Sequence, residues 1–179
     1  MSPKSLLFSL VLPLSLPAVA TAQAEAPDLT DPEVAHVAVT ANTIDAELGA
    51  WAESRAESAE VKRFAAMMQR DHTAVNEKAG ALAGKLGVTP RANPVSESLA
   101  TGAKQARSEL EPLSGTGFDR AYIAREIAFH QAVLDALDQV LIPTTENGEL
   151  KQLLVEVRPA IATHLAYARK LGEKLHASK

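Results

Sequence analysis

The chain has 179 residues, of which 18 are lysine or arginine and 22 are aspartate or glutamate, so its formal net charge is −4. An acidic chain of this kind repels phosphate backbones and anionic lipid headgroups, which argues against binding to nucleic acid or to a membrane surface. The absence of cysteine excludes disulfides, thiolate metal sites and iron–sulfur clusters.

The first residues are typical of an export signal. Lys4 supplies a positive charge, residues 5–19 form an apolar run, and Ala22-Gln23-Ala24 offers small residues for cleavage. The apolar run is too short for a membrane span, which needs about 20 residues. We therefore predict a signal peptide over residues 1–24, a short lead-in over 25–31 and a single domain over 32–177. The mature protein is expected to be exported, either periplasmic or associated with the outer membrane, without a transmembrane span.

Apolar residues recur every three or four positions through the rest of the chain, which is typical of amphipathic helices. The first predicted helix has Asp31 as its N-cap and Pro32 at its first position, and it ends near Glu57. Ser58 is the expected cap of a second helix over about 58–86. A third, weaker helix is predicted over about 95–111, and residues 111–117 are predicted to form a loop.

Two further helices complete the predicted set. The fourth runs from about 119 to 141 and stops before Pro143, and the fifth runs from about 146 to 176. We expect a kink or break at 157–159, because Pro159 removes one backbone hydrogen bond and clashes with the preceding turn. No stretch alternates as a strand does. The sequence thus predicts an all-α protein, an antiparallel bundle of four long helices with one additional shorter helix.

Three histidines lie on the apolar stripes of the predicted helices, where they should face the core. His72 lies on the second helix, His130 on the fourth and His164 on the fifth. A half-polar ring at such a position needs hydrogen-bond partners or a metal ion, because an unpaired buried polar group costs roughly 1–3 kcal/mol. On the second helix the stripe consists of Val61, Ala65, Met68, His72, Val75, Ala79, Leu82 and Leu86.

Helix spacing suggests which carboxylates accompany these rings. Folding the fourth and fifth helices about a turn near residue 144 places Glu126 within about one turn of His164. Folding the first and second helices about a turn near residue 57 places His72 level with about Asn42. Glu47 then lies about 7 Å further along the helix axis.

If metal binds, we expect His130, Glu126 and His164 to form the site, with His72 as a fourth ligand from across the core. Imidazole and carboxylate suit Zn, Cu or Fe, and affinity should fall below about pH 6.5 because the ring must be neutral. The alternative is that each histidine hydrogen-bonds a carboxylate or a backbone carbonyl and fixes the register of its helix.

No arrangement typical of an enzyme is found. The chain lacks Gly-x-Ser-x-Gly, His-Glu-x-x-His and a glycine-rich phosphate loop. A di-iron site needs glutamate three residues before its histidines, but Gln69, Ile127 and Ile161 stand there. The interpretation favoured by these absences is a non-enzymatic exported bundle with a structural, stress-related or binding role. The alternatives are a divalent-metal-binding protein and a module that binds a partner or peptide through its weak third helix.

Three segments resemble motifs of one family. Residues 61–72 resemble "V-x-x-F-A-x-x-M-x-x-D-H", residues 118–130 resemble "F-D-x-x-Y…H", and residues 150–165 resemble "L-K…L-P-x-x-x-x-H-L". These motifs are similar to those of exported bacterial proteins called domain of unknown function 4142, over about residues 33–175. The resemblance implies a ferritin-like helical bundle and an exported protein, and it implies no chemistry. Arg158 stands where the family usually has leucine before its proline.

Overall fold

The structure, a computed structural model, describes residues 27–177, and this part of the chain is helical without strands. The predicted signal peptide and the first residues of the lead-in lie outside the described residues. Within the described range, no helix is long and apolar enough to cross a membrane. The elements are α1 (Asp31–Arg55), α2 (Ala59–Leu86), α3 (Pro94–Leu110), α4 (Gly115–Ala136), the π-helical turn η1 (Leu137–Leu141), α5 (Ile142–Thr144) and α6 (Gly148–Ala177).

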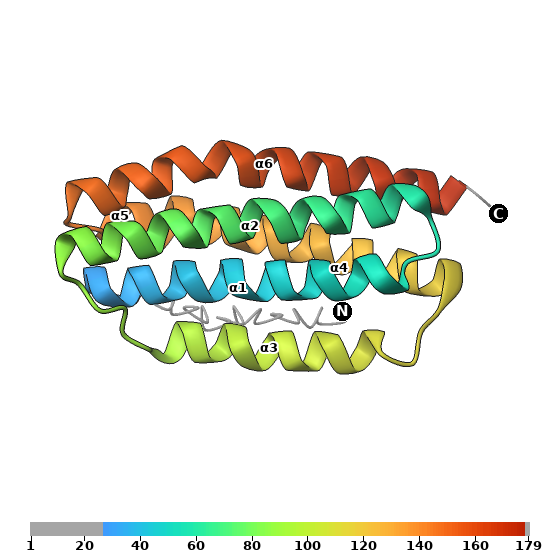
Figure 1. Cartoon of the computed structure of the whole chain (residues 1–179), viewed down its shortest axis with the longest axis horizontal. Helices are drawn as coiled ribbons and strands as arrows, with labels where there is room; N and C mark the ends of the chain where they lie inside the picture. The colour runs from blue at the N-terminus through green and yellow to red at the C-terminus, as the bar shows by residue number, and fades with distance from the viewer. Residues whose placement is uncertain (1–26, 178–179) are drawn as a thin grey trace, which may run out of the picture.

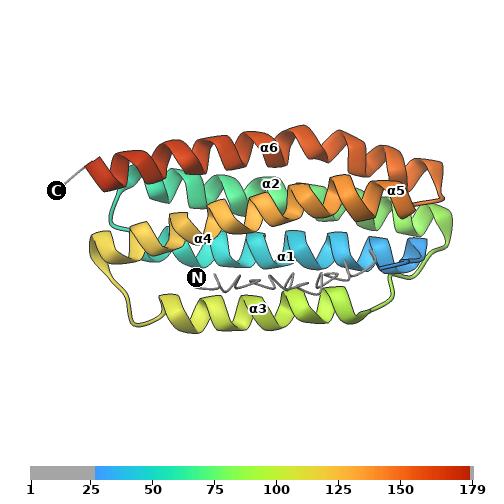
Figure 2. The ribbon, with the colours of Figure 1, turned by 180° about the vertical axis from the view of Figure 1, so that it is seen from behind.

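The long helices α1, α2, α4 and α6 run side by side as a bundle, and each is antiparallel to the two others of this set that it packs against (Figure 1). Helix α1 packs on α2, α2 on α6, α6 on α4, and α4 back on α1. Helix α3 lies outside this ring against α1 and α4, as the reverse view in Figure 2 also shows. The predicted all-helical bundle is thus confirmed.

The start of α1 differs by one residue from the prediction. Thr30, not Asp31, is the N-cap, and the Glu33 carboxylate accepts hydrogen bonds from the Thr30 backbone N–H and hydroxyl at 3.0 and 2.6 Å. Asp31 is free for another role because Thr30 caps the helix. Its carboxylate accepts from the backbone N–H groups of Glu146 and Asn147, at 2.9 Å each, and so ties α1 to the loop before α6.

The turn between α1 and α2 is held from the opposite helix. Ser58 caps α2, as predicted, with its side chain accepting from the Glu60 N–H. The buried Asp119 carboxylate of α4 accepts from the backbone N–H groups of Glu57 and Ser58 at 3.0 and 2.7 Å. A buried carboxylate that accepts two backbone hydrogen bonds is well satisfied, so this contact fixes one end of the bundle.

Two predicted boundaries were wrong, and the chain does not break at Pro159. Helix α4 begins at Gly115, so the predicted 111–117 loop is shorter. Helical structure continues past Pro143, because the chain first widens into η1, where the Ile142 N–H donates to the Leu137 carbonyl five residues back. Helix α6 passes through Pro159 unbroken. Pro159 is on the exposed face, where the Val155 carbonyl that it leaves without a helix partner can bond to water.

Two apolar clusters fill the two halves of the bundle, and the three histidines lie between them. The cluster at the α1–α2 turn contains stacked Phe118 and Tyr122, and Phe64 meets Tyr122 edge-on. The other cluster lies towards the start of α1 and is aliphatic, with Val34, Leu141 and Leu154 among its members. The histidines therefore form a polar layer across an otherwise apolar core.

Helices α1 and α2 approach each other closely at Gly49. A Cβ added there would lie 2.7 Å from the Ala65 carbonyl oxygen and 2.9 Å from the Gln69 nitrogen, both backbone atoms. The two helices would have to move apart to admit a methyl group, because backbone atoms cannot turn aside as a side chain can.

We predict that Gly49→Ala lowers the free energy of unfolding by about 1–3 kcal/mol, as overpacking does. The matched control is Gly102→Ala in α3, where an added Cβ has no neighbour within 4 Å. It should stabilise the protein by roughly 0.5–1 kcal/mol, because alanine favours the helix. Urea unfolding curves measure both. Equal effects of the two substitutions would show that the close approach at Gly49 does not limit packing.

Candidate metal centre

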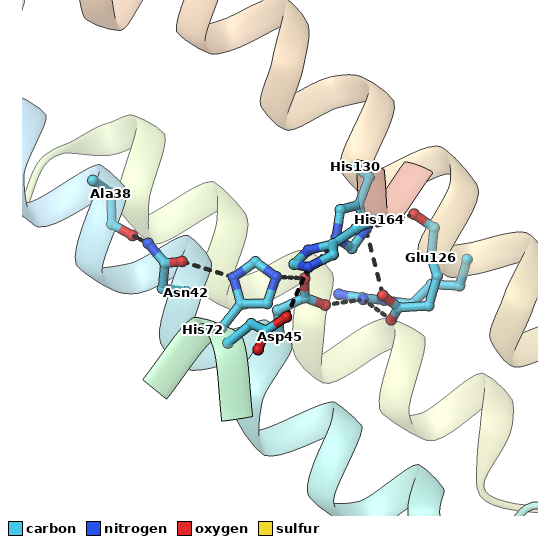
Figure 3. Close-up of polar contacts among 9 residues, drawn as sticks. Ala38, Asn42, Asp45, His72, Glu126, His130 and His164 are labelled. Atoms are coloured by element: carbon cyan, nitrogen blue, oxygen red, sulfur yellow. Dashed lines mark hydrogen bonds and ion pairs between the residues drawn. The ribbon is translucent and has the colours of Figure 1, made fainter. Parts of the chain in front are cut away.

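The polar layer combines side chains from all four long helices. Asp45 comes from α1, His72 from α2, Glu126 and His130 from α4, and His164 from α6 (Figure 3). All five are buried, and none has more than 4% of its surface exposed. Each occupies the inward face of its helix, so the bundle geometry alone brings them together.

One carboxylate oxygen lies at the centre of the cluster. Asp45 Oδ2 is 3.0 Å from His72 Nε2 and 3.3 Å from His130 Nε2. The third ring, His164, has its centroid 5.3 Å from that of His72 and 5.5 Å from that of His130. One nitrogen from each of the three rings lies within 4.8 Å of the others, which is the proximity that metal ligands need.

The opposite nitrogen of each ring faces a hydrogen-bond acceptor. His72 Nδ1 is 2.7 Å from Asn42 Oδ1, and the Asn42 amide is oriented by donating to the Ala38 carbonyl (Figure 3). His130 Nδ1 is 3.0 Å from the backbone carbonyl of Glu126. His164 Nε2 is 3.1 Å from Asp71 Oδ2.

These acceptors decide which nitrogen carries the proton in the neutral rings. An amide oxygen, a carbonyl and a carboxylate accept hydrogen bonds, so the facing ring nitrogens are the donors. The remaining nitrogens, His72 Nε2, His130 Nε2 and His164 Nδ1, therefore present lone pairs. These three atoms and Asp45 Oδ2 are buried without a hydrogen-bond partner.

Burial keeps two of the rings neutral. It lowers the pKa of His130 to about 4, and the neighbouring His72 and His164 add to this effect against the opposing charge of Asp45. Burial likewise lowers the pKa of His164, with a further contribution from His72. At neutral pH both rings are thus in the form that can bind a metal ion.

The pKa values of the two carboxylates shift in opposite directions, although burial acts to raise both. Burial alone would raise the pKa of Asp45, but contact with His72 and the charges of His130 and Arg125 hold that pKa far below its usual range. Burial and the Asp45 charge raise the pKa of Glu126 well above its usual range. Arg125 lies between the two carboxylates, 2.8 Å from Glu126 Oε1 and 3.5 Å from Asp45 Oδ1.

The predicted site residues meet, with one difference in their roles. One group of neighbouring atoms that could bind a metal ion consists of one ring nitrogen each from His72, His130 and His164, as expected from the positions of these residues on the apolar stripes. Glu126 belongs to a second group with Asp45 and His130, where its Oε2 is 3.5 Å from His130 Nδ1. The two groups share His130 but separate Glu126 from His164, and the carboxylate that faces two of the rings is Asp45.

Asp45 was not predicted because Ile44, one residue earlier, also fits the three- and four-residue spacing of the first helix between Ala41 and Leu48, and it is the apolar one of the two. One residue of helix is about 100° of rotation, so a stripe through Ile44 turns Asp45 away from the core. The steps Val37, Ala41, Asp45 and Leu48 are also four, four and three residues, so the sequence carried the signal. Glu47, the carboxylate considered instead, is exposed. Asp71 of α2 contacts α6 through His164.

Comparisons with known proteins give a family and no close relative. No curated protein and no solved structure matches the chain. The model of one family, described as Domain of unknown function (DUF4142), matches residues 16–171, a range that contains all five residues of the cluster. Because this match extends over most of the chain, the protein belongs to the DUF4142 family.

Proposed function

We propose that this chain is an exported, ferritin-like bundle protein that binds one divalent transition-metal ion, Zn, Cu or Fe, in its core. The ligands are His72 Nε2, His130 Nε2, His164 Nδ1 and Asp45 Oδ2. One observation carries the proposal: these four buried atoms have no hydrogen-bond partner, whereas the other nitrogen of each ring has one.

The distances around Asp45 fit a tetrahedral ion. Zn–N and Zn–O bonds are about 2.0–2.1 Å long, so neighbouring ligand atoms of a tetrahedral site lie about 3.3 Å apart. The two contacts of Asp45 Oδ2, at 3.0 and 3.3 Å, are close to this separation. The three ring nitrogens lie within 4.8 Å of one another, so the rings close in by up to about 1.5 Å when they bind an ion at tetrahedral distances.

The outer partners support the same conclusion. A ligating histidine generally donates its other N–H to a carboxylate, a carbonyl or a similar acceptor, which fixes the ring. Asn42, the Glu126 carbonyl and Asp71 fill this place for the three rings. The lone pairs that face inward repel one another and the Asp45 carboxylate, and a cation converts this repulsion into attraction.

The donor types limit the metal. Three imidazoles and a carboxylate suit Zn, Cu or Fe. Four protein ligands leave no open position for a substrate, which is typical of sites that bind a metal without turnover. We therefore propose a binding role in preference to an enzymatic one.

The competing explanation is a purely structural cluster, in which a proton on His72 Nε2 bridges to Asp45. That cluster holds the helices together without metal. The two explanations predict different effects of metal on stability. A metal site that exists only in the folded chain raises the free energy of unfolding when it binds its ion, whereas a purely structural cluster gains no stability from metal.

We predict that Co(II), a spectroscopic substitute for Zn(II), binds the metal-free mature protein in a one-to-one ratio. It should give the strong visible absorption of a tetrahedral site, because three nitrogens and one oxygen surround the ion. Zn(II) should displace it and raise the midpoint of thermal unfolding. His164→Ala should remove both the absorption and the increase.

The control is His36→Ala, which removes a histidine of α1 whose Nδ1 is 3.3 Å from the Thr40 hydroxyl and which lies outside the cluster. This variant should bind Co(II) as the unchanged protein does. If Co(II) gives no tetrahedral absorption, or if both variants bind equally well, the histidines are structural and the proposal fails.

A second prediction concerns Asp45. Asp45→Asn keeps the shape of the side chain but removes the charged oxygen, so Zn(II) affinity should fall by more than the 10- to 100-fold typical of an outer-shell change. Glu47→Gln, two residues along α1 at an exposed position, should leave affinity unchanged. Competition with a chromophoric chelator measures both. An Asp45→Asn protein that keeps its Zn(II) affinity would rule out Asp45 as a ligand.

A further inference from the structure

A cavity of about 120 Å³ lies in the half of the bundle towards the start of α1. Helices α1, α2 and α6, the end of α4 and the turn η1 form its walls. Its inner end is the histidine cluster, with Asp45, His72 and His130, and its outer end is marked by Asp31 and Asn147. Asp31 and Asp45 are fourteen residues apart on α1, so the lined space extends over about 21 Å along the helix axis. A volume of about 120 Å³ spread over this length makes the cavity narrow.

The cavity reflects uneven packing along α2. The apolar stripe of α2 continues without a change from Val61 to Leu86, but only its first half is buried. Val61, Ala65 and Met68 are fully buried, whereas Val75 and Leu82 are half-buried and line the cavity. A stripe of this length is typical of a helix that is covered along its whole face, and here the second half faces a void.

The chemistry of the walls selects an apolar occupant. Between its two ends the cavity is lined by alanine, valine, leucine, isoleucine, phenylalanine, proline and glycine alone. Water in a buried space needs two to four polar partners, and these walls offer none. At the outer end, the Asp31 carboxylate and the Asn147 side chain are engaged with backbone N–H groups.

We propose that this cavity binds one short linear alkyl chain of about six carbon atoms, with at most one polar end. An engineered apolar cavity of roughly 150 Å³ holds benzene, which also has six carbons, so the volume here suits an occupant of that size. The narrow shape favours a linear chain over a ring. A single polar end group can reach Asn42 and the inner face of the histidine cluster, which are the polar groups at that end.

This inference does not depend on the metal. The apolar walls and the volume are the same whether or not an ion occupies the cluster, so the test uses protein kept free of metal by a chelator. Failure of metal binding would leave this proposal standing, and the reverse is also true.

The experiment adds 1-hexanol to the mature protein and measures binding by titration calorimetry and the midpoint of thermal unfolding. We expect one-to-one binding and an increase in the midpoint on the order of 2–4 °C at saturating concentrations. Ala79→Leu fills the cavity from α2 and should abolish binding. Ala74→Leu makes the same change on the exposed face of α2, and it should leave binding unchanged.

Ala35→Leu fills the cavity from α1 and provides a second test if Ala79→Leu folds poorly. Loss of binding in a folded cavity-filling variant, with retention in Ala74→Leu, supports the proposal. Absence of binding to the unchanged protein overturns it, and so does equal binding to all folded variants. Binding of benzene in preference to 1-hexanol would overturn the proposed linear shape.

Discussion

The Asp45 carboxylate is buried in the middle of a helical bundle, and most of the structure is arranged around it. A charge in this position is strongly unfavourable unless partners compensate for it. Here the charged partner is Arg125 of α4, and the Nε2 atoms of His72 and His130 lie 3.0 and 3.3 Å from the carboxylate, where a bound cation would face all three. His164 of α6 completes the cluster through its proximity to the other two rings and its contact with Asp71 of α2. The polar layer therefore ties the registers of all four long helices to one another.

The two sides of this layer differ in packing. Towards the α1–α2 turn, rings of Phe64, Phe118 and Tyr122 interlock, and each is fully buried. Towards the start of α1 the core is aliphatic and contains the cavity. The tightly packed side holds the ligands in place, and the loosely packed side leaves space beside them. The proposed metal site and the proposed alkyl site are therefore neighbours that share Asp45, His72 and His130.

The sequence allowed the helices and the three histidines to be predicted, because helical periodicity places residues such as His130 directly on a core-facing stripe. The sequence was less informative at Ile44 and Asp45, because both fit the helical spacing and only one of two adjacent residues can face the core. The continuation of helix through Pro143 and Pro159 depended on a widened turn and on exposure of the freed carbonyl, and both are tertiary features. The cavity could not be predicted from the second half of the α2 stripe, because periodicity shows which residues face inward and not how closely they pack.

The most direct test of the account is X-ray absorption at the metal edge of the Zn(II)-loaded mature protein. The account predicts a first shell of four light atoms at about 2.0–2.1 Å, with the multiple-scattering pattern of three imidazoles. Replacing Asp45 with asparagine should change the shell while the imidazole pattern remains. A shell made mainly of oxygen, or one with fewer than two imidazoles, would place the metal outside the cluster and contradict the account.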